Sequence, residues 1–385
     1  MKVGLSLPFA HTSDWQRFLA TERREPAPGR PATPDVQIWD EDIQLGLEAE
    51  PLGFESIFCP EHHFTPYCFS TDPLQVLTYF AGRTEQIDLG TMVVVLPWHH
   101  PLRVAEQSTM LQNLLGPDRD LLLGLGRGLA RREYNAFGVD MSESRQRFAE
   151  SVDILKLALT EDRFSYQGTH FTIPDTSMRP YPRDRRLLEN LYGAWGSPPS
   201  APIAAELGLK PFLIPQKPFE DYTAEMDEFA KVRTDSGYAP AQPMIVVWVY
   251  CAETEEQAHA GAMEHMTAYA RTPVLHYEID GAHFAGQKGY EHYATTAQAV
   301  EKYKVDLGAQ LGQIWLDNHV WGTPEQCFDK IQAIHKRWGP SHLITTVKYG
   351  AMPADEARLN MRLFAKEVLP AVKALQDPAP LPPQE

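Results

Sequence analysis

The chain has 385 residues, of which 43% are hydrophobic and 22% are charged, as in most folded globular proteins. With 35 lysines and arginines against 51 aspartates and glutamates, its formal net charge is -16. A surface this acidic argues against nucleic acid or an anionic membrane as a partner, because both select for basic protein surfaces.

Membrane and secretion signals are weak in the sequence. The N-terminal Met-Lys-Val-Gly-Leu-Ser-Leu-Pro is too short an apolar run for a signal peptide, and no stretch approaches the roughly 18 apolar residues of a membrane span. The cysteines are scattered without Cys-x-x-Cys spacing, which fits a reducing cytosol; they are Cys59, Cys68, Cys251 and Cys327. We expect a cytoplasmic protein without a membrane anchor.

Short apolar runs typical of buried strands alternate with helical patterns along the chain. The predicted strands lie near residues 3–7, 57–59, 87–96, 120–125, 191–195, 211–214, 244–250 and 342–348. The predicted helices lie near 40–52, 73–83, 101–115, 142–159, 200–207, 219–236, 254–270 and 354–375, with a capping-box start for one more at Thr323. About eight βα units most simply close into a (β/α)8 TIM barrel, and an open doubly wound sheet is the alternative.

Three stretches interrupt this alternation and are predicted to be insertions. Residues 11–35 are polar and proline-rich, residues 162–190 are predicted to be a loop, and residues 274–322 have many His and Tyr but no clean period. We expect residues 1–375 to form a single domain with these insertions. A proline-rich tail, 376–385, follows and is expected to be disordered.

The segment Glu61-His62-His63 carries the clearest chemical signal, because it follows directly on a predicted strand that should end at Pro60. Ligands gather at the carboxyl ends of strands in α/β barrels. Adjacent residues of an extended segment point opposite ways, so Glu61 and His63 should share one side and His62 the other. We predict that His62 faces the central cavity, although local capping of the strand is a plain alternative.

Metal binding is disfavoured at this segment. A metal-dependent barrel hydrolase needs its imidazoles on one face, as in His-x-His, and adjacent histidines fail that geometry. The doublet His99-His100 has the same defect. We therefore predict no metal site.

Two glycine-containing turns could bind an anion. Gly124-Leu-Gly-Arg-Gly128 is half of a dinucleotide fingerprint, with Leu129 where the last glycine would stand, and its Arg127 could bind a phosphate through the planar guanidinium. In Gly196-Ser-Pro-Pro-Ser200, hydroxyls and free N–H groups at a helix start could hold an anion. A tight turn and simple helix capping are the alternatives.

Taken in order, these motifs resemble the bacterial luciferase family of flavin monooxygenases. The matching motifs lie at Phe58–Thr65, Leu89–Thr91, Val95–Pro97, His100-Pro101, Ala105-Glu106, Gly124–Leu129, Phe137–Met141, Ser144-Arg145, Ala204-Ala205, Gly208-Leu209, Gly322–Glu325 and Phe364–Pro370. The likeness covers residues 1–10 and 36–273 well and 323–375 moderately.

The resemblance implies a barrel that holds reduced FMN at the carboxyl ends of its strands. By position it implies that His62 is the catalytic histidine and that Arg127 holds the FMN phosphate. The remaining residues expected to bind the cofactor are Glu61, Met92, Val93, Ser197 and Ser200. Met92-Val93 falls where the family often has a non-prolyl cis peptide.

The chain departs from the family in two places that bear on chemistry. The reactive cysteine of the luciferases is Gly126 here, and an acidic residue at the start of the phosphate turn is Gly196. The insertions 11–35 and 274–322 are expected to line the substrate mouth, which puts an aldehyde substrate in doubt.

The resemblance implies a two-component FMN-dependent monooxygenase that oxygenates a small organic substrate with O2. A separate NAD(P)H-dependent flavin reductase would supply reduced FMN, and a homodimer is expected. Three other interpretations stay open: a deazaflavin-dependent oxidoreductase of the same fold, a non-catalytic flavin-binding protein, and the disfavoured metal hydrolase.

Overall fold

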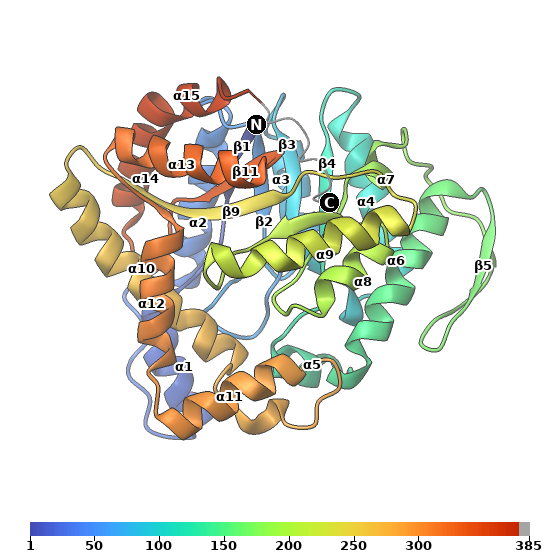
Figure 1. The fold of residues 1–385 in the computed structure, drawn as a ribbon, viewed down its shortest axis with the longest axis horizontal. Helices are drawn as coiled ribbons and strands as arrows, with labels where there is room; N and C mark the ends of the chain where they lie inside the picture. The colour runs from blue at the N-terminus through green and yellow to red at the C-terminus, as the bar shows by residue number, and fades with distance from the viewer. Residues whose placement is uncertain (377–385) are drawn as a thin grey trace.

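The computed structural model describes residues 1–376, and in this part of the chain eight parallel strands form the centre of the protein (Figure 1). They are β1 (Lys2–Ser6), β2 (Ser56–Cys59), β3 (Asp88–Val95), β4 (Leu121–Gly126), β7 (Leu191–Ala194), β8 (Lys210–Leu213), β9 (Met244–Cys251) and β11 (His342–Thr346). The ring closes where β8 pairs with β9 and β11 pairs with β1. The predicted (β/α)8 barrel is confirmed, and closure excludes the open doubly wound sheet.

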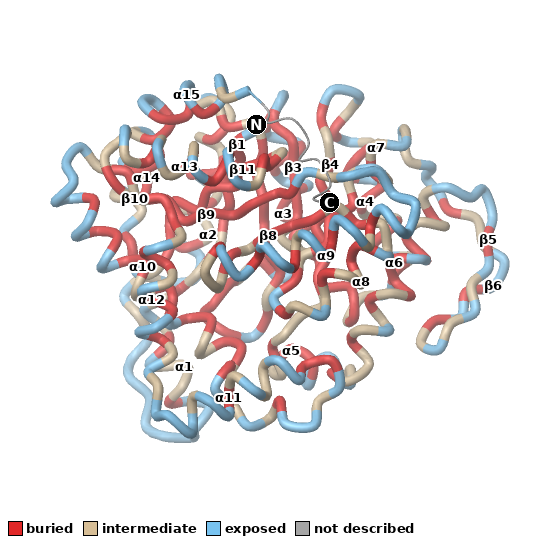
Figure 2. The backbone as a smooth tube through the Cα atoms, viewed as in Figure 1, coloured by how far each residue is buried: buried red, intermediate tan, exposed pale blue. Residues whose placement is uncertain are grey.

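Large side chains fill the barrel interior, and glycines on neighbouring strands leave room for them. Phe58 of β2 and Phe212 of β8 come from strands that are not neighbours, yet their rings lie 6.3 Å apart. A side chain at Gly90 would lie only 2.1 Å from the Phe58 ring, so the ring needs glycine there. Figure 2 shows the buried residues concentrated on the strands and on the helix faces that cover them.

Eight helices follow the strands and cover the outside of the described barrel. They are α2 (Asp35–Ala49), α3 (Pro73–Ala81), α4 (Pro101–Leu115), α6 (Ser144–Thr160), α8 (Ser200–Glu206), α9 (Tyr222–Asp235), α13 (Pro324–Trp338) and α14 (Ala354–Leu363). The predicted capping box of α13 is present: Thr323 accepts from the Gln326 backbone, and Gln326 accepts from the Thr323 backbone. After α14 the chain passes through a π-helical turn (Phe364–Val368) into α15 (Leu369–Lys373).

The insertion at 162–190 is more regular than the predicted loop. It contains an antiparallel hairpin of β5 (Phe164–Gln167) and β6 (Thr172–Thr176), and then the short helix α7 (Arg186–Glu189). The hairpin turn is held by Glu150, whose carboxylate accepts three successive backbone N–H groups, those of residues 169–171. This contact is long-range, so local composition did not reveal it.

The insertion at 274–322 is largely helical, which its irregular sequence pattern did not predict. Helix α10 (Glu255–Tyr277) continues past the predicted end at Ala270, and α11 (Glu291–Tyr303), α12 (Leu307–Asn318) and β10 (Val320–Gly322) follow. An internal proline removes a helix hydrogen bond, so Pro273 argues locally for a stop. Burial of His276 and Tyr277 outweighs that cost and keeps the last turn helical.

Three helices from different parts of the chain lie together at one end of the barrel, at the bottom of Figure 1. They are α1 (Trp15–Glu22), α5 (Arg131–Phe137) and α11. Arg132 of α5 forms an ion pair with Glu22 of α1 at 2.7 Å and donates to the carbonyl of Leu275 at the end of α10. Next to it, Arg131 pairs with Glu278 at 2.8 Å. These contacts fix the insertions over the carboxyl ends of the strands.

None of the helices in residues 1–376 is long and apolar enough to cross a membrane. The predicted disordered tail falls almost entirely outside the described residues.

Candidate active site

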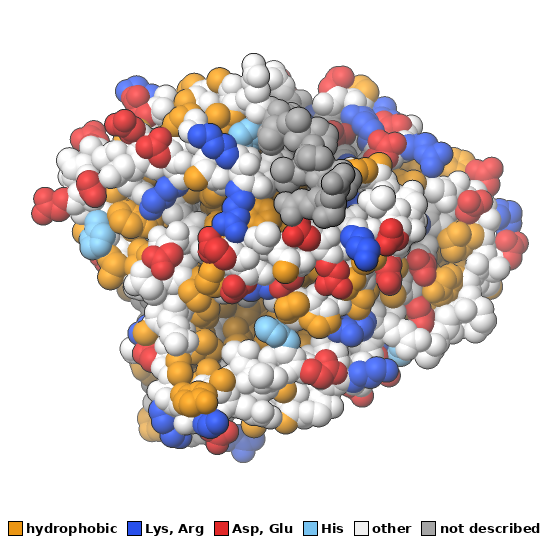
Figure 3. All heavy atoms as spheres, in the orientation of Figure 1, with side chains coloured by type: hydrophobic (Ala, Val, Ile, Leu, Met, Phe, Trp, Pro, Cys, Tyr) orange, Lys and Arg blue, Asp and Glu red, His pale blue; other side chains and the backbone are white. Residues whose placement is uncertain are grey.

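A cavity lies at the carboxyl ends of the barrel strands. Most of the lining residues lie at the ends of β2, β3, β4, β7 and β8 or in the segments that follow them, and the insertion at 274–322 supplies Tyr277, Tyr290 and Tyr293. Every residue that the sequence predicted for the site lines this cavity, namely Glu61, His62, Met92, Val93, Arg127, Ser197 and Ser200. Figure 3 shows a hollow with hydrophobic side chains on this face, where Figure 1 places α9 above and α11 below.

The prediction that neighbours in Glu61-His62-His63 point to opposite sides is confirmed. His63 contacts the Glu61 carboxylate at 3.2 Å, so these two side chains lie on one side. His62 continues the inward alternation that begins at Phe58, and its side chain is 15% exposed to the cavity.

Glu61 is fully buried and joins the end of β2 to the end of β3. Its carboxylate accepts the Val95 backbone N–H at 2.7 Å, the Trp98 indole N–H at 2.8 Å and a His99 ring nitrogen at 2.6 Å. Burial alone raises the pKa of the Glu61 carboxyl, but hydrogen bonds from His63 and His99 and the charge of His99 outweigh it and lower the pKa to about 2. Glu61 therefore stays ionised and fixes this wall of the cavity.

The peptide bond between Met92 and Val93 is cis, as the sequence comparison with the family predicted. Both residues line the cavity. Across from them, a side chain at Gly126 would lie 2.3 Å from the Val93 side chain, so glycine leaves Val93 its position in the wall.

Arg127 reaches into the cavity with neutral partners only among its hydrogen bonds. It donates to the Gly289 carbonyl at 2.9 Å and to the Ser144 hydroxyl at 3.5 Å, and its guanidinium lies 4.3 Å from the centre of the Tyr290 ring. None of these contacts cancels its charge, so the cation remains available to an anion in the cavity.

Arg145 is a second cation beside Arg127, and the sequence analysis did not select it. It donates weakly to the same Gly289 carbonyl, at 3.5 Å, and its buried Nε has no hydrogen-bond partner among the described residues. Burial and the neighbouring charge of Arg127 lower the pKa of Arg145. A bound anion would stabilise this arrangement, because it would reduce the repulsion between the two guanidinium groups and accept a hydrogen bond from the unpartnered donor.

The predicted serine turn lines the same cavity as Arg127 and Arg145. The Ser197 and Ser200 hydroxyls lie 3.0 Å apart, and the Ser200 backbone N–H donates to the Ser197 carbonyl. Gly196 allows the insertion to come close, because a side chain there would lie 2.4 Å from the Tyr293 hydroxyl. This end of the cavity therefore combines two cations with two hydroxyls.

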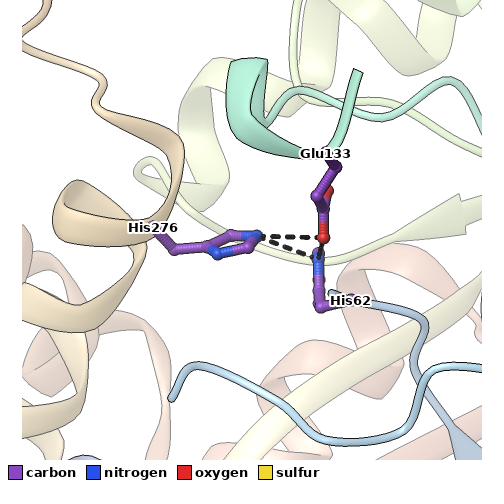
Figure 4. A group of neighbouring side chains, drawn as sticks. All are labelled: His62, Glu133 and His276. Carbon is purple, nitrogen blue, oxygen red and sulfur yellow. Dashed lines mark hydrogen bonds and ion pairs between the residues drawn. The ribbon is translucent and has the colours of Figure 1, made fainter. Parts of the chain in front are cut away.

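The opposite end of the cavity contains a group that sequence reasoning missed. Glu133 of α5 and His276 of α10 contact His62, as Figure 4 shows, and the Tyr277 hydroxyl lies 3.2 Å from His62 Nε2. Only the sequence spacing Arg-Arg-Glu after the glycine turn hints at Glu133, and nothing local marks His276. The three nitrogen and oxygen atoms lie within 4.8 Å of one another, a spacing that could hold a metal ion.

A second cavity lies beside the first insertion, at the carboxyl ends of β1 and β11. Its lining includes His11 and Thr33 from the insertion at 11–35, and a buried pair of Lys348 with Asp42 at 2.7 Å. The insertion at 274–322 thus lines the cavity that contains His62, as expected, whereas the insertion at 11–35 lines this other one.

Comparison with known proteins gives a consistent result. A family profile described as luciferase-like monooxygenase matches residues 18–342. The chain is 29% identical over 233 residues to 4-hydroxyprotoasukamycin monooxygenase of Streptomyces nodosus subsp. asukaensis, an alignment that covers 58% of this chain and 62% of that protein. It is 23% identical to the alkanal monooxygenase alpha chain of Photorhabdus laumondii subsp. laumondii, over 90% of this chain and 96% of that one.

Solved structures share the fold along almost the whole chain. The monooxygenase RslO1 of Streptomyces bottropensis superimposes with a TM-score of 0.69 at 25% identity, over 96% of this chain and 99% of that one. The oxygenating component of 3,6-diketocamphane monooxygenase of Pseudomonas putida, in complex with FMN, gives 0.68 at 19% identity, over 96% and 98%. From the extent of the profile match, this chain belongs to the luciferase-like monooxygenase family.

Proposed function

We propose that this protein is an FMN-dependent, two-component monooxygenase that oxygenates a small organic substrate with O2. One observation carries the proposal: a single cavity is lined by two neighbouring arginines, one of them with a buried donor that has no partner among the described residues, and by a partly exposed histidine that is hydrogen-bonded to a carboxylate. The arginines suit a phosphate, and the histidine suits proton transfer.

The residues at the arginine end fit the phosphate of FMN. Arg127 and Arg145 would hold it through charge-assisted hydrogen bonds, and the unpartnered Nε of Arg145 would gain an acceptor. Ser197 and Ser200 offer hydroxyl donors in the same cavity. The cations stand out against a chain of net charge -16, so their clustering favours an anionic ligand at this place.

The residues between the two ends fit a flat ring. Met92, Val93 and Gly126 form a wall whose close packing leaves no room for a larger side chain at position 126. Reduced FMN, when bound, supplies the reaction with O2 that no side chain can perform. Glu61 would act on the cofactor by holding this wall in place through the backbone of Val95.

The protein's own part is to exclude water and to control one proton. Tyr277 and Tyr290 are buried, Tyr293 is partly buried, and all three line the cavity from the insertion side, so they would shield the reaction from solvent. His62 would take or give a proton at Nε2, the nitrogen that faces the cavity.

The relatives support oxygenation by name, since two of them are called monooxygenases of alkanals and of 4-hydroxyprotoasukamycin. A neighbour of the same fold is an F420-dependent secondary alcohol dehydrogenase, with a TM-score of 0.68 at 15% identity over 96% of this chain and 98% of that one. The choice between FMN and a deazaflavin is therefore part of the proposal.

We further propose that a separate NAD(P)H-dependent reductase supplies reduced FMN, that the protein works in the cytoplasm, and that it forms a homodimer. Exposed apolar side chains on adjacent helices support the dimer: Tyr79 of α3, and Met110 and Leu114 of α4 are 43%, 53% and 59% exposed. Light scattering of the purified chain should give twice the monomer mass of 43.5 kDa. A monomer at micromolar concentration would contradict this part of the proposal.

The cofactor assignment is tested by anaerobic titration with reduced FMN, reduced riboflavin and reduced F420, followed by fluorescence. We expect FMN to bind more tightly than riboflavin, which has no phosphate, and more tightly than F420. Tighter binding of F420 would overturn the choice of FMN, and equal binding of FMN and riboflavin would overturn the phosphate site.

The oxygenation step is tested by stopped flow, in which the anaerobic complex of protein and reduced FMN is mixed with O2. We expect the absorbance change to differ in rate from that of free FMN, because the buried site controls protons and water around the ring. Kinetics identical to those of free FMN would contradict a monooxygenase role. NADH consumption only after a flavin reductase is added would support the two-component assignment.

A further inference from the structure

Three side chains from distant parts of the chain meet at the inner end of the cavity (Figure 4). Glu133 Oε1 lies 3.3 Å from His62 Nδ1, and His276 Nε2 lies 3.1 Å from the same nitrogen. Glu133 and His276 have exposed side-chain fractions of 1% and 0%, so neither contacts solvent, and only His62 reaches the cavity. The geometry therefore links a cavity residue to two buried partners.

Glu133 acts as an acceptor in this group. Its Oε1 also accepts the His63 backbone N–H at 2.7 Å. Burial alone raises the pKa of the Glu133 carboxyl, but the adjacent imidazoles of His62 and His276 outweigh burial and hold the pKa well below its usual range. Because an ionised oxygen offers only lone pairs, the nitrogen of His62 that faces it is stabilised when it carries a hydrogen.

His276 is arranged to complement that hydrogen. Burial above all, with the charges of His62 and Arg132, lowers the pKa of His276 to about 4, so its ring is neutral near pH 7 and carries one proton. His276 Nδ1 lies 2.8 Å from the Thr65 hydroxyl, to which it can donate. His276 Nε2 lies 3.5 Å from Glu133 Oε1, farther than His62 Nδ1 at 3.3 Å, so His276 Nε2 can accept from His62 Nδ1 rather than donate to the carboxylate. The Tyr67 ring stacks on His276 at 4.6 Å and fixes this orientation.

We propose that Glu133 and His276 are positioning residues that keep a hydrogen on Nδ1 of His62 and leave Nε2 as the acceptor. The lone pair of Nε2 is then presented to the cavity as a proton acceptor. This inference rests on the proposed function, which gives His62 its role in proton transfer, and it adds the direction of that transfer.

The direction of transfer defines the class of substrate. An unprotonated Nε2 accepts a proton, which suits a substrate with an ionisable hydroxyl, as in a phenol or an enol. The substrate O–H bond breaks, its proton forms the N–H bond at Nε2, and the electron pair stays on the substrate oxygen. The imidazolium is balanced by the Glu133 carboxylate. The protein's own phenol, Tyr277, already lies 3.2 Å from Nε2, which shows that the site accommodates this group.

The tautomer is measured directly by two-dimensional NMR of the full-length protein, in which the histidines are labelled with nitrogen-15. The His62 signals are assigned as those that disappear in His62→Gln. We expect Nδ1 of His62 to have the shift of a protonated nitrogen and Nε2 that of an unprotonated one at pH 7.5. The reverse pattern in the wild-type protein overturns the inference without any variant being needed.

Two replacements of Glu133 distinguish the effect of its acceptor oxygen from the effect of its negative charge. Glu133→Leu removes the acceptor, and we expect the His62 proton to move to Nε2. Glu133→Gln retains an acceptor oxygen, and we expect the His62 proton to stay on Nδ1. Glu356→Gln is the matched control, because Glu356 accepts from His265 at 2.9 Å in a separate glutamate–histidine contact. An unchanged tautomer in a Glu133→Leu protein that is folded by circular dichroism overturns the inference.

Metal content is measured on the same samples by mass spectrometry, because the three facing atoms could also hold a metal ion. A metal on Nδ1 would displace its proton, so a stoichiometric divalent metal overturns the inference and its absence supports it. The substrate class is tested with 4-nitrophenol, whose absorbance reports ionisation. We expect wild-type protein, and not Glu133→Leu, to raise the phenolate fraction; no change with wild-type protein overturns the phenol assignment.

These outcomes are separable from failure of the proposed function. The NMR and metal measurements use protein without flavin, so they report on His62 alone. Loss of FMN selectivity in the anaerobic titration would overturn the flavin assignment and leave the tautomer result intact.

Discussion

The two ends of the active-site cavity are built in opposite ways. At the histidine end, hydrogen bonds within the protein hold the charged group: the ionised Glu133 carboxylate accepts from His62 and from the His63 backbone. At the arginine end, Arg127 and Arg145 share one carbonyl, that of Gly289, and repel each other.

This difference indicates what each end requires from outside. At the histidine end, Glu133 Oε1 already accepts two hydrogen bonds, and its Oε2 is a buried acceptor without a partner among the described residues, so this end favours a proton or a donor rather than an anion. The arginine end is incomplete in its hydrogen bonds, since the buried Arg145 Nε has no partner among the described residues. Unmet donors in a buried site cost free energy unless a ligand supplies acceptors. A cofactor phosphate would be most strongly selected at that end.

The largest effect should come from His62→Ala, which removes the proton carrier and leaves the arginine end intact. We expect the reoxidation rate of bound reduced FMN, measured by stopped flow, to change by about 10²- to 10⁴-fold, the usual size of general acid–base catalysis. The dissociation constant of FMN should stay within about threefold, because charged hydrogen bonds to the phosphate supply most of the selectivity. Unaltered kinetics would remove His62 from the mechanism.

Arg127→Ala tests the opposite end. Loss of one charge-assisted hydrogen bond, about 1.5 to 3 kcal/mol, should weaken FMN binding by roughly 10- to 100-fold in an anaerobic titration. Riboflavin binding should hardly change, because riboflavin has no phosphate to lose a partner. Arg163→Ala, at an exposed ion pair on the hairpin with Asp175, is a matched control. Equal losses for FMN and riboflavin would contradict the assignment of this end.

Acid should destabilise the protein through histidines that are buried without charge. Burial, with nearby cations, lowers the pKa of His276 to about 4 and of His319 and His342 to about 3. Between these values and the ordinary pKa of about 6.5, the unfolded chain binds more protons than the native one, so stability falls as pH falls. We expect a loss of about 1 to 2 kcal/mol per histidine at pH 5 relative to pH 7.5.

The measurement is urea unfolding at a series of pH values, and His319→Phe is the variant that sharpens it. His319 packs against Trp248 at 4.7 Å, and neither ring nitrogen has a hydrogen-bond partner within residues 1–376, so phenylalanine can replace it. The variant should show a flatter dependence of unfolding free energy on pH, by about one proton. An unchanged slope would contradict the neutral state of His319.

The smallest effect is expected at the serine turn. Ser200→Ala removes one neutral hydroxyl from the cavity, which is worth about 0.5 to 1.5 kcal/mol, or roughly two- to tenfold in FMN affinity. Ser142→Ala, whose hydroxyl does not line the cavity, serves as the control. A loss as large as that of Arg127→Ala would mean that the hydroxyls, rather than the cations, dominate phosphate binding.

Local sequence determined the barrel and one face of the site. Apolar runs predicted the eight strands, and the first residue after β2, Pro60, marks the end of that strand because proline cannot donate to the ladder. The period of two along an extended chain then predicted that His62 points into the cavity and that the Glu61 side chain lies with His63, where its carboxylate contacts the His63 ring and also borders the cavity.

Only the tertiary structure decided what His62 contacts. Glu133 is 71 residues away in sequence and His276 is 214 residues away, and no local pattern relates positions so far apart. The sequence pattern ended this helix near Ala270, yet burial of the turn after Pro273 carries α10 onward to His276. Strand period and turn chemistry are local properties, whereas the pairing of buried polar groups depends on which surfaces packing brings together.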